Sequence, residues 1–118
     1  LIYDIPTMEI LFKNLCIRKL RSYTALLSGK IFHYKDSDNL TCDAVLCLNN
    51  GQYGLIEIKL GGDKSIEEGA KALNKLEQKL DLTKMKKPAF KMVLAGITPY
   101  AYRSLDGVYV VPISTLCP

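Results

Sequence analysis

A long stretch of helical hydrophobic spacing opens the chain, over residues 7–27. Apolar residues recur there every three or four positions, as in a helix with one buried face: Phe12, Cys16, Leu20, Tyr23 and Leu27. Pro6 suits the first turn of such a helix, and Ser28-Gly29 suits its end. The pattern predicts a long amphipathic helix whose stripe faces the core.

Short apolar runs bounded by turn residues come next, at 30–34, 42–48 and 53–60. Runs of this length predict three strands. The polar cluster at 35–39 separates the first two strands. Asn49-Asn50-Gly51 predicts a hairpin that joins the second strand to the third.

Helical spacing returns after Gly61-Gly62. Ser65 and Glu68 have the S-x-x-E spacing in which side chains bond the free amides of a helix start, so they predict a second helix. Its apolar stripe consists of Ile66, Ala70, Leu73, Leu76 and Leu80. Further apolar runs at 90–95 and 108–113 predict two more strands.

The predicted order is α-β-β-β-α-β-β, so we expect an α/β or α+β fold with a central mixed sheet flanked by helices. A doubly wound nucleotide-binding fold is disfavoured, because three successive strands lack intervening helices and no glycine-rich phosphate loop is present. The length of 118 residues predicts a single domain over residues 1–118.

Composition is that of an ordinary globular chain, with 48% hydrophobic and 24% charged residues. No apolar run approaches the roughly 18 residues that cross a bilayer, so we expect a cytoplasmic protein without a membrane partner. The four cysteines form no C-x-x-C pair, and we expect reduced packing thiols: Cys16, Cys42, Cys47 and Cys117. The chain begins at Leu1 without an initiator methionine, and we expect it to be part of a longer protein.

Positive charge is concentrated in one segment, although the net charge is only +4. Residues 71–91 hold seven lysines against Glu77 and Asp81. On the second helix Lys71, Lys75 and Lys79 align at i, i+4 spacing. Two alternatives are open: a solvated lysine face, or a surface that attracts phosphate groups.

Two charged residues lie on one face of the third strand. Alternation places Glu57 and Lys59 with Leu55, on the face opposite Ile56 and Ile58. In one alternative these charges are solvated or paired with each other on a half-exposed strand.

The hairpin register decides whether Asp43, on the second strand, joins Glu57. A two-residue turn at Asn50-Gly51 would point Asp43 to the opposite face. A three-residue loop with Gly51 in the left-handed conformation would pair residue 48 with 52 and set Asp43 opposite Glu57. We predict the three-residue loop.

In that register two carboxylates can share a hard divalent cation. Asp43 and Glu57 would bind Mg²⁺ together with the carbonyl oxygen of Ile58 and water. Lys59 would orient or help deprotonate the attacking water and offset charge on a phosphodiester. The pattern predicts a catalytic centre of Asp43, Glu57 and Lys59.

The order of Asp43, hairpin and Glu57-Ile58-Lys59 between two helices resembles the PD-(D/E)xK nuclease superfamily. Over nearly the whole chain the sequence is also similar to the C-terminal domain of unknown function of bacterial and archaeal AAA-type ATPases. The segments that carry this resemblance are Phe12-Lys13-Asn14-Leu15 with Arg18 and Leu20, Cys42-Asp43-Ala44-Val45, Tyr53-Gly54-Leu55-Ile56-Glu57-Ile58-Lys59 and Tyr109-Val110-Val111-Pro112. The resemblance implies a restriction-endonuclease-like core.

It further implies an upstream P-loop ATPase domain and a winged-helix region in the same polypeptide. No P-loop lysine motif is present here, so ATP would bind only to that upstream domain. Many relatives carry a glutamate where this chain has Lys13, and a lysine cannot bind Mg²⁺. Glu9, one turn earlier, is a candidate auxiliary acid; alternatively it is a solvated acid near the helix N-terminus.

Nuclease relatives often contact nucleic acid through the helix after the Glu-x-Lys strand. The corresponding candidates here are Lys71, Lys75, Gln78 and Lys79. Tyr100, Tyr102 and Arg103 suggest a stacking cluster for single strands, but edge-strand packing is favoured. His33 has no metal-ligand spacing, which favours a structural or solvated role.

Two functions therefore remain open. One is Mg²⁺-dependent phosphodiester hydrolysis of nucleic acid by a nuclease-like domain. The other is a catalytically degenerate module that binds nucleic acid or protein and regulates the attached ATPase. A purely structural interaction domain is a third, simpler alternative.

Overall fold

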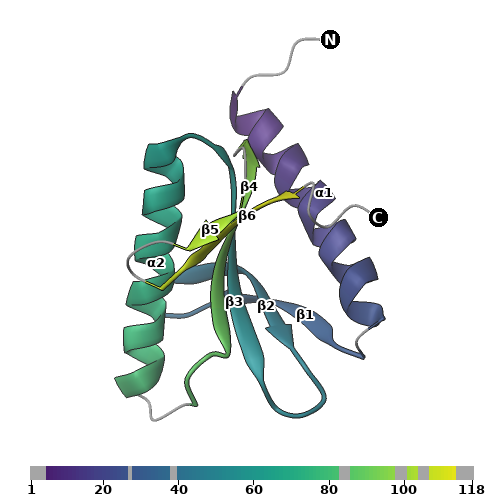
Figure 1. Ribbon diagram of the computed structural model, residues 1–118, viewed down its shortest axis with the longest axis vertical. Helices are drawn as coiled ribbons and strands as arrows, with labels where there is room; N and C mark the ends of the chain where they lie inside the picture. Colours follow the sequence, from purple (N-terminus) through teal and green to yellow (C-terminus); the bar gives the residue numbers. More distant parts are fainter. Residues whose placement is uncertain are drawn as a thin grey trace.

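Two helices cover opposite faces of one mixed sheet (Figure 1). The computed structural model describes residues 5–26, 28–37, 40–82, 86–97, 101–103 and 107–113. The helices are α1, Ile5–Ala25, and α2, Asp63–Leu82. The strands are β1, Lys30–Lys35; β2, Thr41–Cys47; β3, Tyr53–Gly61; β4, Phe90–Ile97; β5, Tyr102–Arg103; and β6, Tyr109–Pro112. The predicted mixed sheet flanked by helices is confirmed.

Within the described residues the sheet has six strands in the order β1-β2-β3-β4-β6-β5. The first three form an antiparallel meander, and α2 then carries the chain across so that β4 runs parallel to β3. β6 is parallel to β4, and the short β5 pairs antiparallel with β6 at the edge. β3 is thus central and covered on both faces, which explains why its middle residues are buried without alternation.

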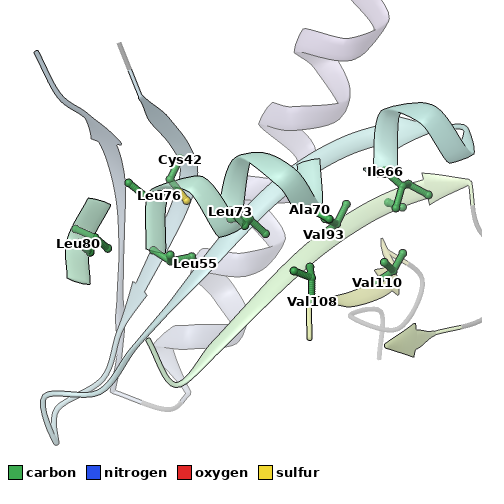
Figure 2. Packing of buried hydrophobic residues seen from close by; sticks show 11 residues of the cluster. Cys42, Leu55, Ile66, Ala70, Leu73, Leu76, Leu80, Val93, Val108 and Val110 are labelled. Carbon is green, nitrogen blue, oxygen red and sulfur yellow. The ribbon is translucent and has the colours of Figure 1, made fainter. Parts of the chain in front are cut away.

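The predicted stripe of α2 is confirmed, because all five of its residues are buried. Figure 2 shows them packed with Leu55, Val93 and Val110 of the sheet and with Val108, which directly precedes β6. Burying each large side chain contributes about 1.5–3 kcal/mol. The predicted helix start is wrong: α2 begins at Asp63, and the N–H of Ile66 donates to the carbonyl of Gly62. Ser65 therefore lies inside the first turn.

α1 packs on the other face of the sheet. Phe12, Cys16 and Leu20 contact a cluster from β2, β3 and β4: Ala44, Leu46, Ile56, Ile58 and Leu94. The predicted stripe fails at Tyr23, which is 49% exposed, because the buried row continues four residues after Leu20, at Thr24. Leu27 lies outside the described residues.

The predicted hairpin register is confirmed. The N–H of Leu48 donates to the carbonyl of Gln52 at 2.9 Å, and Gly51 closes the loop with a φ of 85°. Cys47 pairs with Tyr53 and Ala44 with Ile56. Continuing this register by one residue sets Asp43 opposite Glu57.

Candidate acidic site

A bulge in β2 lies at the position of Asp43. Phe32 pairs with Val45, whereas Tyr34 pairs with Cys42. Asp43 and Ala44 therefore both lie opposite His33, so β2 carries one extra residue here. Bulges of this kind turn a side chain away from its ordinary direction and often lie next to functional sites.

Side chains replace the regular backbone ladder at this point. Pairing of β2 with β3 extends to Ala44 and Ile56. Beyond it, the N–H of Asp43 donates to Oε1 of Glu57 at 3.4 Å. The N–H of Ile58 donates to Oδ2 of Asp43 at 2.8 Å. The predicted neighbours Asp43 and Glu57 thus lie together, and the N–H of Ile58 is bonded to Asp43.

Glu57 is a buried carboxyl group, only 7% exposed. Burial, and after it the nearby Asp43 carboxylate, raise its pKa to about 7, while Lys59 acts in the opposite direction. Two carboxyl groups in a poorly hydrated place repel one another when both are charged. The site therefore favours a proton or a cation between them.

Lys59 shares the α2 face of β3 with Glu57, as predicted. Its stem passes over Gly69 of α2: a Cβ at position 69 would lie 3.4 Å from Cγ and Cε of Lys59. The lysine stem therefore packs against α2, between helix and sheet.

A second lysine, Lys13 of α1, contacts the acid pair. Its Nζ lies 3.2 Å from Oδ1 of Asp43. The sequence indicated only that Lys13 replaces an acidic ligand. Its contact with Asp43 was not predicted. The available signal was that Lys13 directly follows Phe12, which begins the buried stripe, so a long side chain there reaches the sheet.

The donor set fits a hard divalent cation in part. Carboxylate oxygens of Asp43 and Glu57 suit Mg²⁺. Among the described residues no group of three histidine, cysteine, aspartate or glutamate side chains could hold a metal ion. The ligands of a cation would therefore be these two carboxylates, a backbone oxygen and water. The cation would also lie close to the Lys13 ammonium group, which is bonded to Asp43. The Ile58 carbonyl as a ligand stays a prediction.

Glu9 is exposed on α1, one turn before Lys13. Among the described contacts, Lys13 rather than Glu9 reaches Asp43. A role for Glu9 as an auxiliary acid stays a prediction.

The basic row of α2 divides into two parts. Lys71, Lys75 and Gln78 are exposed. Lys79 instead forms an ion pair with Asp36, at 2.7 Å between Nζ and Oδ2. Lys91, in the same basic segment, donates hydrogen bonds from Nζ to the side chains of Asn74 and Glu77 on α2. The free positive charge on this face is therefore smaller than the lysine count suggests.

The remaining candidates lie apart from the acid pair or outside the description. His33 is exposed on β1. Tyr102 is 39% exposed on the edge strand β5, which agrees with the favoured edge-strand position. Tyr100 and the side chain of Arg103 lie outside the described residues.

Three of the four cysteines are described, and all three are free thiols, as predicted. Cys16 and Cys42 are fully buried. Burial raises the pKa of Cys16 to about 11 and that of Cys42 to about 12, so both stay protonated at neutral pH. Cys117 lies outside the described residues.

Fold and site together define an α/β/α sandwich protein with a buried carboxyl pair at a strand bulge. Neither helix within the described ranges is long and apolar enough to cross a bilayer. The chain belongs to a family described as "Domain of unknown function (DUF4143)", whose family model matches residues 8–116. This confirms the part of the resemblance that concerns a domain of unknown function. No curated protein and no solved structure was found to match the chain.

Proposed function

We propose that this chain is a nuclease-like domain of an AAA-type ATP-binding protein, with a Mg²⁺-dependent centre for phosphodiester hydrolysis in nucleic acid. The observation that carries the proposal is the meeting of Asp43 and Glu57 at the bulge, with Lys59 on the face of Glu57. Paired carboxylates next to a lysine are the groups that metal-assisted hydrolysis uses.

Each residue has a distinct task in this proposal. Asp43 and Glu57 would hold the cation, with the Ile58 carbonyl as a further ligand. When bound, Mg²⁺ supplies a Lewis acid that polarises the phosphoryl oxygen. Lys59 would offset negative charge that develops on the phosphodiester. The packing of its stem between β3 and Gly69 would keep its ammonium group in place.

Nucleic acid would lie along α2 in this proposal. Lys71 and Lys75 are exposed cations one turn apart, and Gln78 is an exposed hydrogen-bonding group close by. Lys79 would contribute less, because Asp36 already neutralises it. Binding through phosphate contacts falls with rising salt, since each contact releases a counterion.

A second candidate is a catalytically degenerate module that binds nucleic acid or protein and regulates an attached ATPase. The contact between Lys13 and Asp43 favours it, because an ammonium group already satisfies one oxygen of the acid pair. In this case the basic face of α2 would still bind, but hydrolysis would be absent.

The test is a cleavage assay on single- and double-stranded DNA and RNA with Mg²⁺ or Mn²⁺. Asp43→Asn keeps an oxygen that accepts the Ile58 N–H, so we expect a folded protein without cleavage. Glu67→Gln removes an exposed acid from α2 and is the matched control. Cleavage that survives Asp43→Asn would exclude this centre. Salt-sensitive binding without any cleavage would favour the second candidate.

A further inference from the structure

The contact between Lys13 and Asp43 joins a partly exposed cation to a more enclosed anion. The Lys13 side chain is 41% exposed, whereas that of Asp43 is 17% exposed. Lys13 comes from α1 and Asp43 from the β2 bulge, so the ammonium group spans two layers of the fold. A lysine with this much exposure can exchange its partner for water by rotating its stem.

Charge balance explains why the ammonium group lies there. Oδ2 of Asp43 is bonded to the N–H of Ile58, and Oδ1 faces Nζ of Lys13. The buried Glu57 carboxyl lies next to the same aspartate. Two carboxyl groups that share so little water need a positive charge, and Lys13 supplies one from the chain itself.

A divalent cation at the acid pair would meet the same oxygen. Oδ1 of Asp43 faces an ammonium group only 3.2 Å away. A cation bound to that oxygen would be repelled by Lys13 over a short distance in a partly buried place, where charges are poorly screened. The divalent cation and the Lys13 ammonium group therefore weaken each other's binding to Asp43.

Lys59 is the other lysine near Glu57, but it is held differently. Its stem packs against Gly69 between sheet and helix, with Cγ and Cε at ordinary contact distance from a Cβ at position 69. The Lys13 side chain is 41% exposed and comes from α1, on the opposite face of the sheet. Lys13 is therefore the lysine that can leave when a metal ion arrives.

We propose that Lys13 is a tethered cation that competes with divalent metal for Asp43, so metal binds only when the Lys13 side chain moves away. This proposal rests on the metal site of the proposed function and adds a residue that controls its affinity. Two linked binding events of this kind usually change each other's affinity by about 5- to 150-fold. Removing the ammonium group should tighten metal binding within that range.

The experiment is calorimetric titration of Mn²⁺ into the purified chain and its variants. Lys13→Gln removes the charge and keeps a polar side chain that is one atom shorter, and Lys13→Ala is the second variant in case one folds poorly. Lys13→Arg keeps the charge. Arg21→Ala removes an exposed positive charge from the same helix and is the matched control. Thermal unfolding of each variant confirms the fold.

We expect Lys13→Gln and Lys13→Ala to bind Mn²⁺ at least about 5-fold more tightly than the unchanged chain, with Lys13→Arg and Arg21→Ala unchanged. Equal affinity in all of them, with binding lost in Asp43→Asn, would overturn the role of Lys13 and leave the metal site standing. Absence of Mn²⁺ binding in every variant would overturn both. Equal tightening by Arg21→Ala would reduce the effect to net charge and also overturn the role of Lys13.

Discussion

Replacing Glu57 by glutamine should stabilise the protein at alkaline pH. Burial and the neighbouring Asp43 raise the pKa of Glu57 from 4.5 to about 7. An acid whose pKa is raised by folding holds its proton more tightly in the folded state. The stability that protonated Glu57 contributes is fully present below the unfolded pKa. It is lost as the pH rises through the folded pKa of about 7.

The magnitude follows from the two pKa values. Deprotonating Glu57 in the folded protein costs up to about 3 kcal/mol relative to the unfolded chain. Glutamine imitates the protonated acid, since its side-chain oxygen can still accept the N–H of Asp43. Glu57→Gln should therefore raise the free energy of unfolding by about 2–3 kcal/mol at pH 8 and change it little at pH 4.5.

Urea denaturation at both pH values, in the presence of a chelator, measures this difference. Glu67→Gln, at an exposed glutamate of the same chain, should show no comparable gain. A loss of stability at pH 8 in Glu57→Gln, or an effect that does not depend on pH, would refute the reasoning. Either result would mean that Glu57 is not held as a destabilised carboxylate.

Two further changes test the packing and the basic face. Gly96→Ala should destabilise the fold by about 1–3 kcal/mol in chemical denaturation, because its Cβ would lie 2.5 Å from the carbonyl oxygen of Leu60. Unchanged stability would contradict the close approach of these strands. Lys71→Ala should lower affinity for a DNA duplex and reduce the salt slope by about 0.9, whereas Lys79→Ala, paired with Asp36, should change the slope less in fluorescence titrations. Equal effects of both would refute the division of the lysine row.

Local signals predicted the parts of the structure that local interactions decide. The α2 stripe follows from a regular three-to-four spacing, and the register follows from Gly51, whose positive φ suits a three-residue loop. The start of α2 was missed because the glycine pair before Asp63 allows the helix to begin earlier than the S-x-x-E pattern suggests. Tyr23 was placed in the buried stripe wrongly, because the helical pattern allows the next buried residue to lie either three or four positions after Leu20. The structure has the four-residue spacing, at Thr24.

The site depends on contacts between distant segments, so less of it could be predicted. The partnership of Asp43 with Glu57 followed from the hairpin register. The bulge opposite His33 depends on the pairing of β1 with β2, for which the chain between them gives no turn signal of fixed length. The contact of Lys13 with Asp43 spans 30 positions and requires α1 to be placed on the sheet first.

The two carboxyl groups of the site differ in what the fold gains from them. Asp43 accepts the N–H of Ile58 at 2.8 Å and faces Lys13, so its charge is well compensated. Glu57 accepts a long bond from the N–H of Asp43 and lies beside the Asp43 carboxyl group, and its pKa is raised. Asp43→Asn should therefore leave the stability within about 1 kcal/mol, since it loses only a partly exposed ion pair.

This contrast separates structural from functional roles. If the acid pair served only the fold, both substitutions would destabilise it, because each would remove a favourable interaction. A stabilising Glu57→Gln beside a nearly neutral Asp43→Asn, measured in the same urea series at pH 8, would mean that the charge of Glu57 opposes folding. A buried charge that opposes folding calls for a ligand that compensates it, which is what the metal titrations test. Destabilisation by both variants would instead assign the pair to the architecture of the bulge.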